Sequence, residues 1–260
     1  MDKQTLRVRA MQSIGNALVS EGDYAGAQAS LQRALNHAKA DAQRASILND
    51  MSWVMIQRGE LEKASSYAEE AIKICETQAH NGPLRAQILD HLGTIAEMMK
   101  DLPKSLSYHQ QSFNIKQTLG DVYAVAESAN NLGVVYRSLE NYPEALTFFK
   151  QSLESNKKIG HALGIAMSTL NMGNAYTDQD DLDNAIPTFR SALEMFRQMG
   201  HKQGMATCLD NLAACLEDTQ DKELAREYLI QAYDLYKEIG DAEGQTRIQE
   251  VLSDGADSEE

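Results

Sequence analysis

The chain has 260 residues, of which 43% are hydrophobic and 24% charged, and it carries a formal net charge of −14 at pH 7. A chain of this composition can bury a substantial core, and its negative charge argues against nucleic acid or an anionic membrane as the main partner. The sequence has neither the apolar centre of a signal peptide at its start nor a run of roughly 18 apolar residues, so we expect a cytoplasmic protein.

The three cysteines, Cys75, Cys208 and Cys215, are an odd number without CxxC spacing. This pattern argues against a disulfide framework and against a zinc site. Cys208 and Cys215 stand two turns apart on one helix face, where small thiols are commonly buried. We therefore expect thiols that pack in the core rather than a redox pair.

A repeat of forty residues runs through most of the chain. Glycines mark this interval in two series, which are Gly120, Gly160, Gly200 and Gly240, and Gly93, Gly133 and Gly173. The first two units are less regular, with intervals of 37 and 41 residues. Because a period of this size decides the architecture, we expect helix pairs that stack and bury a continuous core.

In chain order, the predicted units are six helix pairs near residues 4–40, 42–80, 83–120, 122–160, 162–200 and 202–240. A capping helix is predicted over 242–252, which makes 1–252 a single domain. The remaining residues, 253–260, form an acidic tail that we expect to be disordered. Prolines are few and hairpin turns are missing from the pattern, so the prediction is nearly all helix.

Repeat four shows the pattern within one unit. Its first helix has apolar residues at steps of three or four, namely Val125, Ala129, Leu132, Tyr136 and Leu139. The sequence NYPEA then favours a helix start with Asn141 as the N-cap and Glu144 three residues beyond it. The second helix should end at Gly160, which can adopt a left-handed conformation. Gly133 in mid-helix indicates that a neighbouring helix approaches closely.

Repeat five contains a proline where the pattern predicts helix. Pro187 lies well inside the second helix of this repeat if Asp181 is the N-cap. Proline lacks an amide hydrogen and its ring crowds the preceding turn. We therefore expect a bend near Asp183 to Pro187.

The order of Leu132, Gly133, Tyr136, Ala145 and Phe149 resembles the signature of the tetratricopeptide repeat. The resemblance covers about residues 4 to 240, and the unit is similar to the longer repeats of kinesin light chains, Pins-type polarity scaffolds and bacterial peptide-sensing regulators. It implies an all-α, right-handed superhelical solenoid of about six helix-turn-helix units plus a C-terminal capping helix. Repeats two and three are expected to pack less regularly because four residues depart from the signature, which are Ser52, Ala68, Ser105 and His109.

The resemblance also implies that the first helices line a concave groove, where ligands lie as extended peptides or helices. Asn131, Asn171 and Asn211 occupy the same inward position in successive repeats, and Ser13, Asp50 and His91 occupy it earlier in the chain. An asparagine amide both donates and accepts hydrogen bonds, so a row of amides can bind a peptide backbone. In the alternative interpretation, these amides bond only neighbouring repeats or water.

The same face is predicted to be acidic. It also carries Asn49, Asp90, Glu97, Glu127, Asn130, Asn174, Asp178, Asp210, Glu217 and Asp218. Arg9 and Arg137 are the cations expected there, and Arg137 either holds an acidic group of a ligand or pairs with Glu97 or Glu127. We therefore expect a basic or neutral ligand, and the alternative is a solvated acidic face. Apolar anchors of a ligand would meet Trp53, Met98, Val134, Met167 and Leu170, although Trp53 could equally be a core residue.

Catalysis finds little support in the sequence. It lacks the GxGxxG, GxxxxGK[ST], HExxH and GxSxG motifs, and its carboxylates lack calcium-loop spacing. We expect no enzyme activity, no cofactor and no metal. The predicted function is a non-catalytic adaptor for a protein or peptide segment. The alternatives are a sensor that responds to a signalling peptide, and self-assembly through repeats one and two; we expect a monomer or a weak homo-oligomer.

Overall fold

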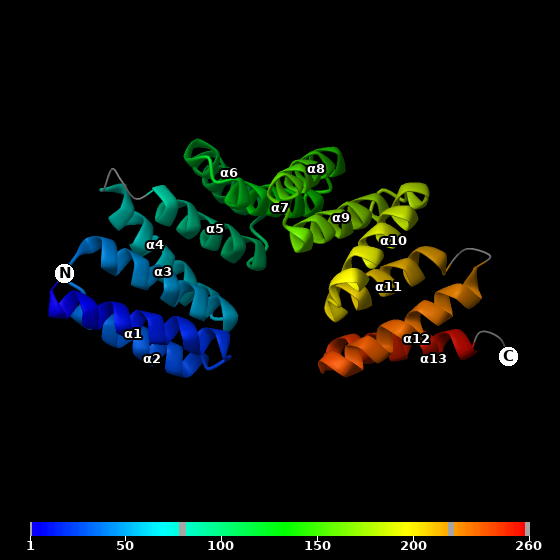
Figure 1. The fold of residues 1–260 in the computed structure, drawn as a ribbon, viewed down its shortest axis with the longest axis horizontal. Helices are drawn as coiled ribbons and strands as arrows, with labels where there is room; N and C mark the ends of the chain where they lie inside the picture. Colours follow the sequence, from blue (N-terminus) through cyan, green and yellow to red (C-terminus); the bar gives the residue numbers. More distant parts are fainter. Residues whose placement is uncertain (1, 78–81, 218–220, 258–260) are drawn as a thin grey trace. The chain divides into compact units, whose positions relative to one another are not determined.

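The computed structural model describes residues 2–77, 82–217 and 221–257, and within these ranges it consists of 13 α-helices without a strand (Figure 1). The helices are α1 (Lys3–Ser20), α2 (Tyr24–His37), α3 (Asp41–Gln57), α4 (Leu61–Glu76), α5 (Gly82–Met98), α6 (Leu102–Leu119), α7 (Val122–Ser138), α8 (Tyr142–Ile159), α9 (Ala162–Thr177), α10 (Leu182–Met199), α11 (Lys202–Leu216), α12 (Lys222–Ile239) and α13 (Ala242–Asp257). The all-α fold of repeated helix pairs with a final helix is confirmed.

Two compact units make up the chain, Met1–Ser128 and Ala129–Glu260, and their boundary falls within α7. In the first unit, α1 packs on α2, α3 on α4 and α5 on α6, and each pair contacts the next. In the second unit, contacts run from α8 through α9, α10, α11 and α12 to α13. Each unit therefore buries its core between consecutive helices, as stacked repeats do.

Small residues let the two helices of a repeat approach closely. A Cβ atom on Gly133 would lie 2.5 Å from the ring of Phe149, and a Cβ atom on Gly173 would lie 2.5 Å from the ring of Phe189. Both rings are fully buried. The close approach predicted from the recurring glycine is confirmed, and the atom that requires it is an aromatic ring of the second helix.

Repeat two reverses the sizes at this contact. Ser52 stands where other repeats have glycine, and Ala68 stands where they have the aromatic ring; both are fully buried. The Ser52 hydroxyl donates a hydrogen bond of 2.9 Å to the Ala64 carbonyl. Repeat three keeps the glycine, Gly93, and the ring that lies against it is His109, which is 1% exposed. These departures from the signature are thus complementary in volume and stay buried.

The helix ends follow the sequence signals with one exception. Gly120, Gly160, Gly200 and Gly240 end their helices with φ between 65° and 76°, the left-handed region that suits glycine. Asn141 does occupy the N-cap of α8, but its side chain makes no capping hydrogen bond. The predicted asparagine cap is wrong in this respect. The preceding residue, Glu140, has φ of 58° and makes the turn between the two helices.

Three further expectations concern single segments. Pro187 lies inside α10, which is one helix from Leu182 to Met199; the bend itself stays a prediction. The final helix α13 continues past Leu252 to Asp257, so part of the segment expected to be disordered is helical, and 258–260 lie outside the described residues. All three cysteines are free and buried, as predicted. None of the helices in the described ranges combines the length and the hydropathy that a membrane span needs.

Candidate functional site

The inward position predicted to bind ligands makes contacts between consecutive repeats in the first unit. Asp50 accepts hydrogen bonds from the amides of Gln12, at 2.7 Å, and Asn16, at 3.2 Å, both on α1. The ring of His91 stacks on Trp53 of the preceding repeat, with 5.3 Å between the centroids. Burial lowers the pKa of His91 to about 4, so this imidazole is neutral at physiological pH.

In the second unit, too, the residues at the inward position form contacts between consecutive repeats. The Asn171 amide donates to the Asn130 oxygen at 2.8 Å, and the Asn211 amide donates to the Asn174 oxygen at 2.7 Å. We call these two hydrogen-bonded pairs the asparagine couples. They join repeats four and five and repeats five and six. Both donors are half-buried, and each amide keeps one further N–H and its oxygen for other partners.

Asn131 occupies the equivalent place in repeat four. It is half-buried and makes no hydrogen bond to another described residue. The three asparagines thus recur at the same position of each repeat, but only Asn171 and Asn211 form hydrogen bonds to a neighbouring repeat. Bonding between repeats, the alternative weighed from the sequence, applies to Asn171 and Asn211. The amide groups without a partner among the described residues are the ones a ligand could use.

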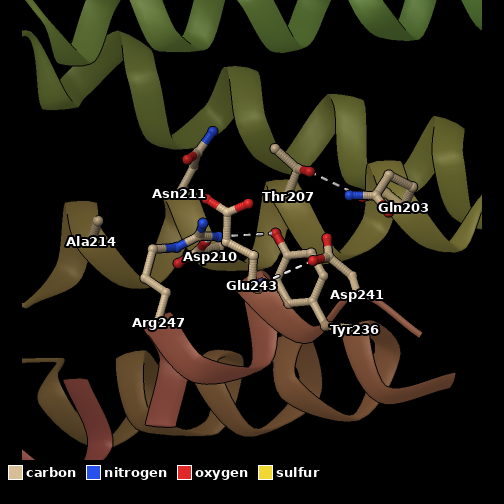
Figure 2. Close-up of a pocket in the computed structure, with 10 residues that line it drawn as sticks. Gln203, Thr207, Asp210, Asn211, Ala214, Tyr236, Asp241, Glu243 and Arg247 are labelled. Atoms are coloured by element: carbon tan, nitrogen blue, oxygen red, sulfur yellow. Dashed lines mark hydrogen bonds and ion pairs between the residues drawn. The ribbon is translucent and has the colours of Figure 1, made fainter. Parts of the chain in front are cut away.

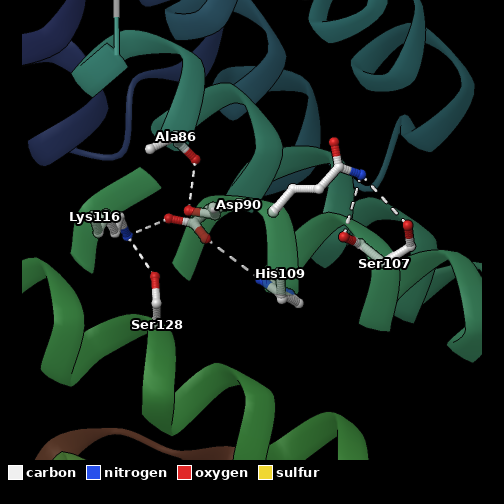
Figure 3. A network of polar contacts seen from close by, with 8 residues as sticks. Ala86, Asp90, Ser107, His109, Lys116 and Ser128 are labelled. Carbon is white, nitrogen blue, oxygen red and sulfur yellow. Dashed lines mark hydrogen bonds and ion pairs between the residues drawn. The ribbon is translucent and has the colours of Figure 1, made fainter. Parts of the chain in front are cut away.

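Three predicted groove carboxylates have cationic partners within the protein, and two of these cations were not foreseen. Asp90 pairs with Lys116 of α6 and lies 3.4 Å from His109 (Figure 3). Asp210 pairs with Arg247 of α13. Lys116 and Arg247 come from a second helix and from the final helix, so a count restricted to first-helix positions missed them. The face is therefore less acidic than the sequence predicted.

Arg137 forms the third of these pairs. Its Nε lies 3.0 Å from an oxygen of Asp178, which is one repeat further along the chain. The predicted internal role of Arg137 is thus seen with a different carboxylate from the two named in advance. Glu127 is exposed, and its charge raises the pKa of Tyr123 on the same helix.

Some predicted groove residues lie elsewhere. Asn49 is only 1% exposed, so its assignment to the ligand-facing surface is wrong. Its place in the repeat, one position before Asp50, had put it on that face. Helix α3, however, contacts α2, α4 and α5, and Asn49 is buried among these helices. Leu170 is likewise buried, whereas Met98 and Met167 are exposed as predicted. Trp53, for which the sequence left both surface and core open, is 39% exposed. Asp218 lies outside the described residues.

A polar pocket of about 580 Å³ opens beside the second asparagine couple. Figure 2 shows its lining residues, which are Gln203, Thr207, Asp210, Asn211 and Ala214 of α11, Tyr236 of α12, and Asp241, Glu243, Gly244 and Arg247 at the start of α13. Asp210 and Asn211 are predicted site residues. The others were missed because the final helix was treated from its sequence only as a cap.

Arg247 organises the charged side of this pocket. Its guanidinium contacts the Asp210 carboxylate, donates to the Tyr236 hydroxyl at 3.3 Å, and lies 5.7 Å from the centre of the Tyr236 ring. Burial raises the pKa of Tyr236, so the phenol stays protonated. Asp241 accepts the backbone N–H of Gly244 at 2.9 Å and so caps α13.

Glu243 is the remaining charge in the pocket wall. It is exposed and has no cationic partner among the described residues. The pocket thus has three carboxylates and one guanidinium, which favours a neutral or positively charged group of a ligand. Within the described ranges, no cluster of three or more potential metal ligands occurs.

Comparison with known proteins identifies the fold. Solved structures with this fold include BtubC (BKLC) from P. vanneervenii, with 15% identity, coverage of 92% of this chain and 93% of that one, and a TM-score of 0.69. A Rap protein complexed with competence and sporulation factor matches at 14% identity over 98% of this chain and 76% of its own, with a TM-score of 0.70.

A putative kinesin light chain repeat protein from Podosopora anserina matches at 13% identity over 79% of this chain and 100% of its own, with a TM-score of 0.65. A search of curated proteins finds no match. The Tetratricopeptide repeat family matches residues 6–77, 84–158 and 164–238, which is most of the chain. The chain therefore belongs to the tetratricopeptide repeat family.

Proposed function

We propose that this protein is a non-catalytic interaction scaffold that binds an extended or helical peptide segment of a partner protein. The binding surface of the second unit comprises the exposed parts of α9 and α11 and the pocket beside α13. The observation that carries the proposal is the pocket of about 580 Å³, which adjoins the Asn211 couple and is lined almost entirely by polar side chains. In a concave site, convergent polar groups fix the orientation of a ligand.

Hydrogen bonding to the peptide backbone is the first part of this proposal. Each asparagine couple uses one donor and one acceptor, so Asn171 and Asn211 each retain an N–H and a carbonyl oxygen. Their spacing along the stack presents these groups repeatedly on one face of the unit. A peptide backbone offers donors and acceptors in alternation, and such contacts hold a ligand without selecting its sequence.

Charge is the second part. Arg247 is already paired with Asp210, whereas Glu243 is exposed and unpaired among the described residues. An unneutralised carboxylate in the pocket wall attracts lysine or arginine side chains and repels acidic ones. We therefore infer that the peptide is basic or neutral, and that binding weakens as salt is added.

A peptide-responsive regulator is the second candidate. The Rap protein of similar fold was solved in complex with competence and sporulation factor, and this supports the second candidate. In this chain the asparagine couples join consecutive repeats, so a ligand that competes for them would also change how the repeats are held together. A change in small-angle scattering on addition of a selected peptide would favour the regulator over a passive scaffold.

The test begins with peptides selected from a random display library on the full chain. A fluorescein-labelled selected peptide is then titrated with the parent protein and with Asn211→Ala, Glu243→Gln and Glu144→Gln. Glu144 is exposed on α8 and serves as the matched control. We expect the two pocket variants to weaken binding by about fivefold or more, the value of one lost hydrogen bond or charge contact, while the control has no effect. Selection of acidic peptides, or equal binding by all three variants, would overturn the proposal.

A further inference from the structure

Helix α1 has two apolar faces, and only one of them is covered. Val8 and Gly15 are buried, and Met11 and Leu18 pack with them against the core of the first unit. The opposite face carries Leu6 and Ile14, which are 51% and 55% exposed. These are the two most exposed large hydrophobic side chains in the described residues. A helix that is apolar on both sides normally has a partner on both sides.

The uncovered face has a regular composition. Leu6, Ala10 and Ile14 follow one another at steps of four, so they form one row on the helix surface. Ser13 and Ala17 flank this row and are exposed, as is Ala10. We call these five residues the α1 stripe. Two large side chains alternate in it with small ones, the arrangement that lets two helices interlock at close distance.

The last helix, α13, differs from α1 because its outward face is polar. Outside the pocket, the exposed residues of α13 include Thr246, Gln249 and Glu250. A terminal helix of a repeat stack needs such a polar outer face to remain in water. The α1 stripe lacks it, so its exposure is not explained by a capping role.

We propose that the α1 stripe is a homodimer interface, in which two copies pack α1 against α1 in antiparallel orientation about a two-fold axis at Ala10. The stripe is symmetric about this residue, because Leu6 precedes it by four positions and Ile14 follows it by four. In the antiparallel pair, Leu6 of each copy therefore meets Ile14 of the other. An interface of this kind is self-complementary, as two-fold symmetry requires.

Charge supports the antiparallel orientation. The cations of α1, which are Lys3, Arg7 and Arg9, all lie in its N-terminal half, and its C-terminal half has no charge before Glu21 at the C-cap. Parallel pairing would set the three cations of each copy against those of the other. Antiparallel pairing about Ala10 instead sets Lys3 against Ala17 and Arg7 against Ser13, both of which are uncharged, and the two helix dipoles then oppose each other favourably.

The expected dimer is weak. One helix from each copy buries less than the roughly 1,200 Å² of total surface that separates transient from stable interfaces. Sedimentation velocity from about 1 to about 300 µM should therefore show the mass rise from 28.8 kDa toward twice that value. A constant monomer mass over this range overturns the proposal, and so does a series of larger species, since those require head-to-tail contacts rather than a closed pair.

Variants test the surface itself. Leu6→Gln combined with Ile14→Gln should raise the dimer dissociation constant by about tenfold or more while leaving helix content and the melting temperature unchanged, since both side chains already face water. The matched control is Ile230→Gln on α12, where the side chain is 47% exposed. Equal effects of the two substitutions, or none from the double variant, would contradict the assignment.

A cross-link tests the symmetry. Ala10→Cys places one thiol of each copy beside the two-fold axis, and the three native thiols are buried. Mild oxidation should convert this variant to a disulfide-linked dimer, whereas Ala25→Cys, exposed on α2, should remain monomeric. A dimer that forms by sedimentation but does not cross-link through position 10 would rule out the two-fold arrangement.

Discussion

Replacing Lys116 with methionine tests the buried charge network of the first unit (Figure 3). The Lys116 side chain is 11% exposed and pairs with Asp90, whose side chain is 17% exposed, and it donates to the Ser128 hydroxyl at 2.8 Å. Methionine fills a similar volume but removes the charge, so Asp90 is left buried without its cation. Breaking a buried pair in this way costs about 3–5 kcal/mol of unfolding free energy.

Urea unfolding followed by circular dichroism at pH 7 measures this cost. The double variant Asp90→Asn with Lys116→Met should recover most of the loss, because neither remaining group is charged. His109, 3.4 Å from Asp90, still offers a hydrogen-bond partner to the new amide. A Lys116→Met protein within about 0.5 kcal/mol of the parent would refute the reasoning, since it would show that water already solvates the Asp90 carboxylate.

The pH dependence provides an independent check on the same residues. Burial raises the pKa of Asp90, but hydrogen bonding from His109 and the charge of Lys116 outweigh it, so the folded-state pKa lies below the ordinary value. Stability from this group is therefore present above the unfolded-state pKa of about 4 and lost as the pH falls through the folded-state pKa. Without Lys116, burial dominates and the pKa rises. The penalty of Lys116→Met should then shrink as the pH falls from 7, because Asp90 takes up a proton.

Three further predictions concern packing and thiols. Gly173→Ala should lower the free energy of unfolding, measured by urea titration, by about 1–3 kcal/mol, because its methyl group would overlap the Phe189 ring; adding Phe189→Leu should restore part of the loss. Pro187→Ala should raise the free energy of unfolding by about 2 kcal/mol, because it supplies the N–H that the Asp183 carbonyl lacks in α10; an unchanged midpoint would contradict this. Burial raises the pKa of Cys208 to about 12, so this thiol should not react with a disulfide reagent at pH 8 until urea unfolds the protein.

The fold was predictable because its signals are local and repeated. The helix starts follow from a forty-residue period and from caps such as Asp181, and the helix ends follow from glycines such as Gly160. Each signal depends on neighbours within one or two turns, and the repetition averages out single errors. The side chain of Asn141 illustrates the limit, since it stands at the predicted cap position but makes no capping bond.

The site was less predictable because its partners lie far apart in the chain. Asp90 is separated from Lys116 by 26 positions, and Asp210 is separated from Arg247 by 37 positions. Periodicity identifies which residues share one helix face, but it does not tell which long side chain of another helix reaches across to them. The acidity of the predicted groove was overestimated for this reason. The prediction for Asn49 was wrong for a different reason. Asn49 is one position before Asp50, and on a helix that single step turns the side chain into the core.

The asparagine couples link stability to binding in the second unit. Asn171 and Asn211 each hold the preceding repeat with one N–H, and the proposed ligand takes the groups that remain on the same amides. A bound peptide would therefore fix the rotamers on which the contact between repeats depends. Binding to the folded state alone stabilises it by RT ln(1 + [L]/Kd), about 2.7 kcal/mol at a hundredfold excess over Kd. Removing Asn211 should cancel part of this gain beyond its effect on affinity, because one side chain serves both contacts.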